Sequence, residues 1–438
     1  MTRFSLFHLA FLALFLLALT LLSAPAWAQS PFFAREIPVD VSPAKASLDA
    51  LGVNATGEYL AVWQVDAGGG NFDIWARRAV LQPDFRWLGD AFAVADSAKS
   101  ERAAAVAYNP TDDEFLVVYE YVYNAEDSDV RAQRVAGSAA APADVIGPVL
   151  SVGVTTGNEN MPDVAFLAAT GQYLAVYSMD GDVWGRRIAR RGQGDQDGDF
   201  LGDEFIIAAD AYAETHPVVA AASAESYFMV AYTYAFSPDD DDVRAQRVRG
   251  RRQNGEELLG AHLALADSAD RENAPTLAYS SSAHAFITLW QVSIPFNHDI
   301  RGVWVDAANY SDKPIIGQAF DVAADVLAME NAPQVDVDAR TGEVAVAFSY
   351  ADMVGSWSRP ALVWLTPDPR VEKHVSRSVQ ALPERSFQTL APRIRLWSGQ
   401  SRFLTGYTAR RGTSADADRD VYLLDVSRWG VALPIISR

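Results

Sequence analysis

Short apolar segments bounded by polar or turn residues recur along the whole chain after residue 30. β-Branched and aromatic residues dominate them, which is typical of strands. No segment after residue 30 shows a long apolar period of 3.6 residues, so helix should be scarce and the fold all-β. The seven most apolar segments lie at 59–63, 115–119, 173–177, 227–232, 285–290, 344–348 and 403–407.

A recurring sequence motif, called here the phrase, follows most of these segments. It reads Asp-Ile-Trp-Ala-Arg-Arg at 73–78, Asp-Val-Arg-Ala-Gln-Arg at 129–134 and 242–247, and Asp-Val-Trp-Gly-Arg-Arg at 182–187. Weaker copies stand at 299–304 and 420–424. The phrase returns about every 53 to 61 residues, and the last gap spans two periods. A fixed period of this size indicates a repeat architecture.

Each repeat contains four predicted strands. The first follows a proline or small residue, as at 162–166 and 275–279; the third is the phrase, or 359–363 where the phrase is lost; the fourth is short, as at 205–208. Near-continuous apolar strands must be covered on both faces, and four-stranded units that pack on copies of themselves are propeller blades.

These features predict a seven-bladed β-propeller of four-stranded blades, with eight blades as the alternative. The repeats are expected at 47–102, 103–160, 161–215, 216–273, 274–331, 332–389 and 390–438. Ring closure needs a strand from one terminus to complete the blade of the other. Both 37–41 and 433–436 suit that place, and the sequence does not choose between them.

The third repeat carries a family resemblance in Asp182-Val183-Trp184-Gly185-Arg186-Arg187-Ile188, Leu201-Gly202 and Phe205-Ile206-Ile207. This pattern resembles the propeller-like repeats of uncharacterised exported bacterial proteins. The resemblance covers nearly the whole chain after residue 28. The resemblance implies a propeller fold and an extracytoplasmic location, but little chemistry. The Asp-box of sialidase blades and the Gly-His…Trp-Asp signature of WD40 blades are absent.

Residues 1–28 have the features of a signal peptide. Arg3 precedes an apolar run from Phe4 to Leu22, and Ala26-Trp27-Ala28 fits the cleavage rule. The mature chain should therefore be a single domain over 29–438, in the periplasm, secreted or on the cell surface. The long apolar run leaves an uncleaved anchor as the alternative. After cleavage no other run of 18 apolar residues remains for membrane insertion.

Composition narrows the classes of partner. The chain has no cysteine, which excludes disulfides and thiolate chemistry. Its net charge is −20, so its surface should repel nucleic acid. Such a surface favours a basic protein, another cationic ligand or a neutral glycan as partner. The alternative interpretation is that the negative charge only keeps the protein soluble.

The phrase holds an aspartate and, five residues later, an arginine. They recur as Asp73 with Arg78, Asp129 with Arg134, Asp182 with Arg187 and Asp242 with Arg247. A role repeated in four blades is rarely catalytic. The recurrence predicts buried ion pairs between blades, because a buried charge needs a partner.

A glutamate stands three residues before the start of five predicted first strands. These glutamates are Glu101, Glu159, Glu214, Glu272 and Glu330. Loops that enter the innermost strands meet around the channel mouth, so the five should form a partial ring that binds a cation or cationic ligand there. The structural interpretation is that each carboxylate accepts backbone N–H groups within its own loop.

A calcium site is the functional interpretation of the segment 195–203. Asp195, Asp197, Asp199 and Asp203 place oxygen ligands at alternate positions beside Gly198, a spacing that suits Ca²⁺. The alternative is a hydrophilic hairpin turn.

No catalytic motif stands out. The mature chain has five histidines and no zinc spacing, nucleophile elbow or phosphate loop. The sequence therefore predicts an exported propeller that acts as a binding or scaffold module for cations or carbohydrates. The alternatives are a carbohydrate-active enzyme, either a glycoside hydrolase or a lyase, that uses channel-face carboxylates, and a purely structural cell-surface protein.

Overall fold

The computed structural model describes residues 33–40, 45–196, 198–295, 297–311, 314–352, 358–371, 375–381, 388–396, 402–410 and 419–427. The predicted signal peptide lies outside these residues, as does the 433–436 segment. Every element named within the described residues is a β-strand, which confirms the all-β prediction. These residues include no helix long and apolar enough to cross a membrane.

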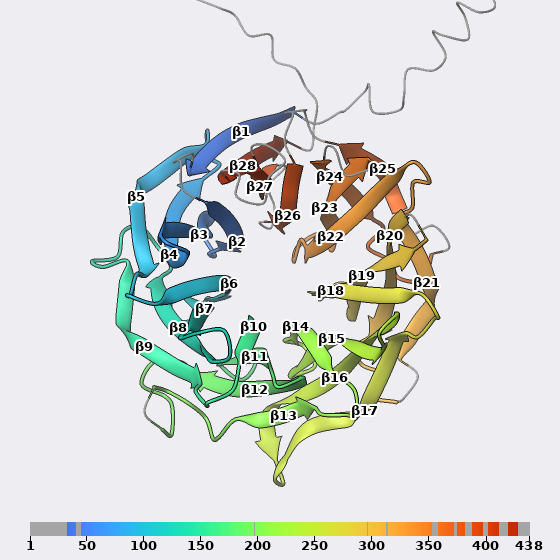
Figure 1. Ribbon diagram of the computed structural model, residues 1–438, viewed down its shortest axis with the longest axis horizontal. Helices are drawn as coiled ribbons and strands as arrows, with labels where there is room; N and C mark the ends of the chain where they lie inside the picture. Colours follow the sequence, from blue (N-terminus) through green and yellow to red (C-terminus); the bar gives the residue numbers. More distant parts are fainter. Residues whose placement is uncertain are drawn as a thin grey trace, which may run out of the picture.

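Seven four-stranded antiparallel sheets surround a central axis in the described part of the chain (Figure 1). This count confirms the seven-bladed propeller and disfavours the eight-bladed alternative. Blade 1 contains β2 (Ala46–Val53), β3 (Glu58–Gly68), β4 (Asn71–Val80) and β5 (Arg86–Ala95). Blade 2 contains β6 (Ser100–Asn109), β7 (Glu114–Val122), β8 (Ser128–Ala136) and β9 (Val145–Gly153). Blade 3 contains β10 (Glu159–Leu167), β11 (Gln172–Met179), β12 (Asp182–Ala189) and β13 (Phe205–Ala208).

The remaining blades continue in the same order. Blade 4 contains β14 (Glu214–Ala222), β15 (Tyr227–Ser237), β16 (Asp240–Gln253) and β17 (Glu256–Ala266), and blade 5 contains β18 (Arg271–Ser280), β19 (Ala285–Ile294), β20 (Asn297–Asp306) and β21 (Ile315–Ala323). Blade 6 contains β22 (Ala328–Val337), β23 (Val344–Asp352), β24 (Ser358–Leu365) and β25 (Val375–Ala381). Blade 7 contains β26 (Gln388–Arg395), β27 (Arg402–Arg410), β28 (Arg419–Ser427) and β1 (Phe33–Asp40).

The N-terminal strand β1 closes the ring. It pairs with β28 as the outermost strand of blade 7, in a register that runs from Phe33↔Ser427 to Asp40↔Val421. Figure 1 shows β1 on the outer rim beside β28, next to blade 1. The first of the two closing segments considered from the sequence therefore takes this place. In blade 6, β24 provides the third strand that 359–363 was expected to form.

The hydrophobic core is divided among the seven junctions between neighbouring blades. The second strand of each blade is buried on both faces, as in β7 and β11, and one apolar cluster forms at each junction. The junction of blades 1 and 2, for example, packs Val62 and Ile74 against Phe115 and Val117, all fully buried. Because each blade uses its neighbours to cover its faces, stability depends on a closed ring.

The innermost strands share a β-bulge near their first residues. The register with the second strand shifts at this point in β6, β10, β14, β18, β22 and β26. In five of the six, a non-glycine residue has positive φ there: Ala103, Met161, His216, Ala274 and Ala332. A proline follows four of these residues, as expected on an edge strand whose free side faces the channel.

The predicted Asp–Arg pairs of the phrase do not form. Five strand residues span about 16 Å, so the aspartate and the arginine lie at opposite ends of their strand. Each arginine instead reaches the next blade and donates to a backbone carbonyl there. Arg78 binds Ala136 O at 2.7 Å, Arg134 binds Ala189 O at 2.8 Å, Arg187 binds Arg249 O at 2.7 Å and Arg247 binds Asn309 O at 2.9 Å.

Candidate functional site

The five glutamates do not form an open ring at the channel mouth. Each is at most 2% exposed and turns into the loop that precedes its own strand. Oε1 of Glu159 accepts from Thr155 N at 3.1 Å, Oε1 of Glu214 from Asp210 N at 3.0 Å and Oε1 of Glu330 from Asp325 N at 3.4 Å. Glu101 bonds Ser97, and Glu272 accepts from the Ser268 hydroxyl. The arrangement is the structural one considered from the sequence.

The second oxygen of each glutamate is buried without compensation. Oε2 has no hydrogen-bond partner among the described residues in any of the five. In every case the phrase aspartate of the preceding blade lies near enough to act on the glutamate. Burial first, and neighbouring carboxylates second, raise the glutamate pKa values, to about 7 in Glu214 and Glu272 and about 8 in Glu330.

One junction brings three carboxylates together. Asp240 and Asp242 of β16 and Glu272 of β18 each place one ligand oxygen within 4.8 Å of the other two. This cluster, called here the 4/5 acidic junction, could hold a metal ion. Within the described residues it is the one group of three or more potential metal ligands at such distances.

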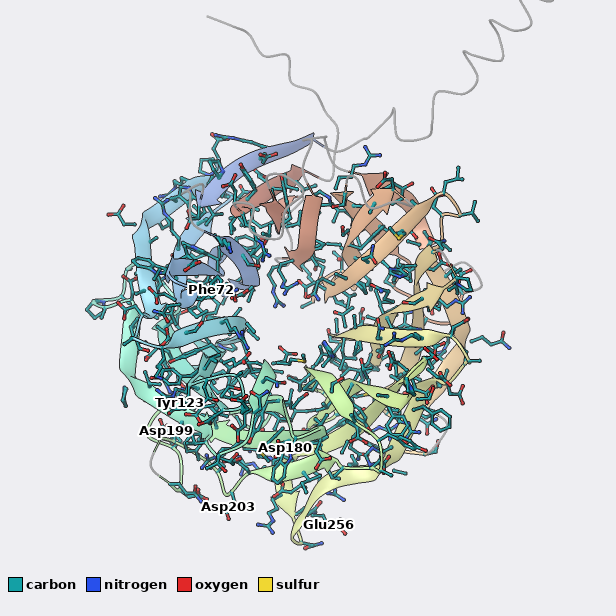
Figure 2. All side chains as sticks on the ribbon, viewed as in Figure 1. Phe72, Tyr123, Asp180, Asp199, Asp203 and Glu256 are labelled. Carbon is teal, nitrogen blue, oxygen red and sulfur yellow. The ribbon has the colours of Figure 1, made fainter. Side chains whose placement is uncertain are left out.

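The described aspartates of the 195–203 segment do not converge as those of the 4/5 acidic junction do. Asp199 accepts from Gly192 N at 2.7 Å and pairs with Arg134 at 3.3 Å, and Asp195 accepts from Gly202 N at 3.2 Å. Figure 2 shows Asp199 and Asp203 on the outer side of the ring, away from the channel. Asp197 lies outside the described residues, so the predicted calcium loop stays a prediction.

A cavity of about 800 Å³ occupies the centre of the ring. The innermost strands of all seven blades line it, mostly with alanine, valine and other apolar residues. The charged groups on its wall are not repeated from blade to blade: they are Asp49, Asp163, Asp336, Arg393 and Arg395, called here the channel set. The sequence analysis missed them, although an acidic residue within a predicted inner strand, as at Asp163, was a signal.

The channel aspartates hold neighbouring blades together. Asp49 Oδ2 accepts from Ala104 N at 3.3 Å, Asp163 Oδ2 from Val219 N at 2.8 Å and Asp336 Oδ2 from Leu396 N at 2.6 Å. In each case the donor belongs to the innermost strand of the next blade or to the residue directly after it. Asp163 Oδ1 also accepts from Val164 N at 2.9 Å, and all three aspartates are among the residues that line the cavity.

Two arginines of blade 7 face these carboxylates. Arg395 pairs with Asp336 at 3.3 Å and donates to Leu51 O at 2.9 Å, while Arg393 Nε donates to Asp49 O at 2.5 Å. Burial raises the pKa of Asp49 to about 7 and of Asp163 to about 6, although nearby guanidinium charge opposes both shifts. The channel thus offers carboxylate acceptors and guanidinium donors close together, as in the Arg395–Asp336 pair.

Aromatic side chains also line the cavity. Tyr108, Phe166 and Tyr279 occupy the same place in β6, β10 and β18 and are partly exposed. Each packs on an aromatic residue of the next strand, with ring centroids 4.8–5.2 Å apart. Three tryptophans of the repeated strands, Trp63, Trp290 and Trp304, are at most 3% exposed and belong to the core.

The raised pKa values predict that stability falls as pH rises. Between about pH 4.5 and 8 the folded chain holds protons on Glu214 and Glu330 that the unfolded chain has released. Their stabilising contribution is complete below about pH 4.5 and is lost as pH passes the folded values. We expect a double Glu214→Gln, Glu330→Gln variant to be more stable than the parent at pH 8, by on the order of 1 kcal/mol per carboxyl, and similar at pH 5.

Denaturant midpoints at pH 5 and pH 8, measured in EDTA, check this expectation. An advantage of the double variant that is equal at both pH values would contradict it.

Comparison with known proteins supports the fold alone. No family model and no curated protein matches the chain. Among solved structures, a protein of unknown function from Dyadobacter fermentans matches with a TM-score of 0.50 at 7% identity, over 90% of this chain and 99% of that one. The β-propeller domain of the trilobed protease from Pyrococcus furiosus matches with a TM-score of 0.45 at 7% identity, over 90% and 99%.

A sialidase from Trypanosoma rangeli matches with a TM-score of 0.46 at 7% identity, over 91% of this chain but 59% of that one. None of these matches identifies a family or an activity, and the β-propeller assignment rests on the seven four-stranded sheets of the described residues.

Proposed function

We propose that this protein is an exported binding module that takes a saccharide in its central channel. The observation that carries the proposal is the cavity of about 800 Å³ with the channel set on its wall. Small-molecule sites are concave, mostly apolar and fixed by a few polar groups, and their volumes are about 300–1,000 Å³. The export part rests on residues 1–28, and N-terminal sequencing that finds Gln29 first would support it.

The chemistry of the wall suits a sugar better than a simple ion. Carboxylates accept from hydroxyl groups and guanidinium groups donate to them, so Asp163 and Arg395 offer complementary partners to a polyol. The partly exposed rings of Tyr108, Phe166 and Tyr279, which line the same cavity, offer apolar faces for pyranose C–H groups. Because negative and positive groups share the wall, the channel itself does not select a strongly charged ligand.

A glycan array followed by calorimetry on the mature protein tests the proposal. Asp163→Asn retains an oxygen that can accept from Val219 N but removes the charge, so we expect the fold to survive and saccharide affinity to fall about tenfold or more. Glu256→Gln, whose side chain is 68% exposed in β17 on the outer rim, should bind as the parent does. Equal affinity of Asp163→Asn and the parent would refute a channel site.

A carbohydrate-active enzyme is the second candidate. One observation favours it: Asp49 and Asp163 share a cavity and have pKa values near 7 and 6, which suit proton transfer at neutral pH. Mass spectrometry of the bound saccharide after incubation separates the two functions. Cleavage that Asp49→Asn abolishes, with binding retained, would establish hydrolysis or elimination, whereas an unchanged saccharide supports binding alone.

A further inference from the structure

The 4/5 acidic junction joins two blades through buried carboxylates. Asp240 and Asp242 stand at the start of β16, the third strand of blade 4, and Glu272 stands at the start of the innermost strand of blade 5. Glu272 is 2% exposed and Asp242 is 8% exposed. Oxygens from all three residues lie within 4.8 Å of one another, so like charges are held at a distance where they repel strongly.

The hydrogen bonds at this junction leave oxygens unsatisfied. The Ser268 hydroxyl donates to Glu272 Oε1, but Glu272 Oε2 and Asp240 Oδ1 are buried and find no donor in the described part of the chain. A buried, unsatisfied carboxylate oxygen is costly. Arg244 acts on Asp242 from nearby, but no described residue donates to these two oxygens, so they are available to a cation.

Two arginines near the junction, Arg271 and Arg244, bond to carboxylates outside the cluster. Arg271 donates to Asp241 Oδ2 at 2.8 and 3.0 Å, and Arg244 donates to Asp210 at 3.0 Å. Two further carboxylates, Asp267 and Asp270, lie close enough to act on the cluster. The local charge is thus strongly negative where three carboxylate oxygens converge.

We propose that the 4/5 acidic junction binds one Ca²⁺ ion that links blade 4 to blade 5, independently of any ligand in the channel. Three carboxylates from two strands provide the hard oxygen ligands that Ca²⁺ prefers, and water completes the six to eight positions. The ion offsets most of the buried negative charge and coordinates the oxygens that have no donor. Because the ligands come from two blades, the ion fixes the junction as well as the local loop.

Comparison with the other junctions explains why this one is singled out. Glu101, Glu159, Glu214 and Glu330 also face a phrase aspartate, but no third carboxylate joins them within coordination distance among the described residues. The junction of blades 3 and 4 is the closest control. Glu214 has the same place in the repeat and 0% exposure, yet Asp210 beside it already binds Arg244.

Calcium titration of the EDTA-treated mature protein, by calorimetry and thermal unfolding, tests the proposal. We expect one tight site and a melting temperature that rises with Ca²⁺. Glu272→Gln should weaken binding about 100-fold, because Ca²⁺ affinity depends on the number of charged ligands. Glu214→Gln should bind Ca²⁺ as the parent does. If Glu272→Gln fails to fold in EDTA, Asp242→Asn provides the same comparison.

A second comparison separates this site from the 195–203 segment. A triple Asp195→Asn, Asp197→Asn, Asp203→Asn variant should keep the tight site. Loss of that site in the triple variant, unchanged affinity in both Glu272→Gln and Asp242→Asn, or absence of any Ca²⁺ response in the parent would each overturn the proposal.

Discussion

A chain that begins at Val41, without β1, should lose its cooperative folding. This truncation removes the strand that pairs with β28 over seven residue pairs and leaves blade 7 with three strands. It also uncovers the apolar cluster between blades 7 and 1, to which Ile37 belongs. We expect a loss comparable with the whole stability of a typical domain, about 5–15 kcal/mol, because every blade needs both neighbours.

The exposed edge of β28 should make the truncated chain associate, since an unpaired edge strand is a template for pairing with other chains. Size-exclusion chromatography and thermal unfolding provide the measurement. A chain that begins at Pro31 is the matched control and should behave as the mature protein does. A peptide of residues 33–41 added to the truncated chain should restore a monomeric, cooperative state. A truncated chain that stays monomeric with an unchanged melting curve would contradict closure by β1.

Arg134→Met should destabilise the protein by about 3–5 kcal/mol, the usual cost of breaking a buried ion pair from one side. Arg134 pairs with Glu114, and the two side chains are 3% and 1% exposed. The substitution leaves the Glu114 charge buried, with Tyr173 Oη at 3.3 Å as a weak donor. It also removes the donor to Ala189 O, which joins blade 2 to blade 3.

The double variant Arg134→Met, Glu114→Gln should recover most of this loss, because neither charge then remains buried. Arg301→Met provides an exposed comparison. Its partner Asp321 is 62% exposed, so the expected loss is about 0–1 kcal/mol. Denaturant midpoints measure all three variants. Similar midpoints for Arg134→Met and Arg301→Met would show that the buried contacts of Arg134 with Glu114 and Ala189 O contribute little to the free energy of unfolding.

The blade pattern could be predicted from sequence because it depends on local regularities. Segments such as 173–177 are apolar throughout, and only a strand covered on both faces tolerates this. The closing strand could not be chosen in the same way. Residues 37–41 and 433–436 are both short and apolar with one proline, and the choice depends on register against β28, which is a long-range property.

The predicted ring of glutamates differs from the structure in side-chain direction, whereas the 195–203 calcium loop stays a prediction. The five glutamates share one place in the repeat, as predicted, but Ser97, Thr155 and Ser268, each four residues earlier, turn their glutamates into the loop. The phrase arginines were correctly expected between blades. Their partners could not be found from the sequence, since Arg187 binds Arg249 O, 62 residues away in the next blade.

The channel set was missed for a related reason. Asp49, Asp163, Asp336, Arg393 and Arg395 come from four blades and do not repeat, so a search for recurring motifs passes over them. Only closure of the ring brings blade 7 beside blade 1 and places Arg393 against Asp49. A function that depends on such residues is visible in the assembled ring and not in any single repeat.

A crystal structure of the mature protein with the saccharide selected by the glycan array tests channel binding most directly. We expect density for the sugar inside the ring, with hydroxyl groups in contact with Asp163 and Arg395 and a pyranose face toward Tyr108, Phe166 or Tyr279. Density for the sugar on the outer rim, with the channel holding only water, would contradict the proposed function.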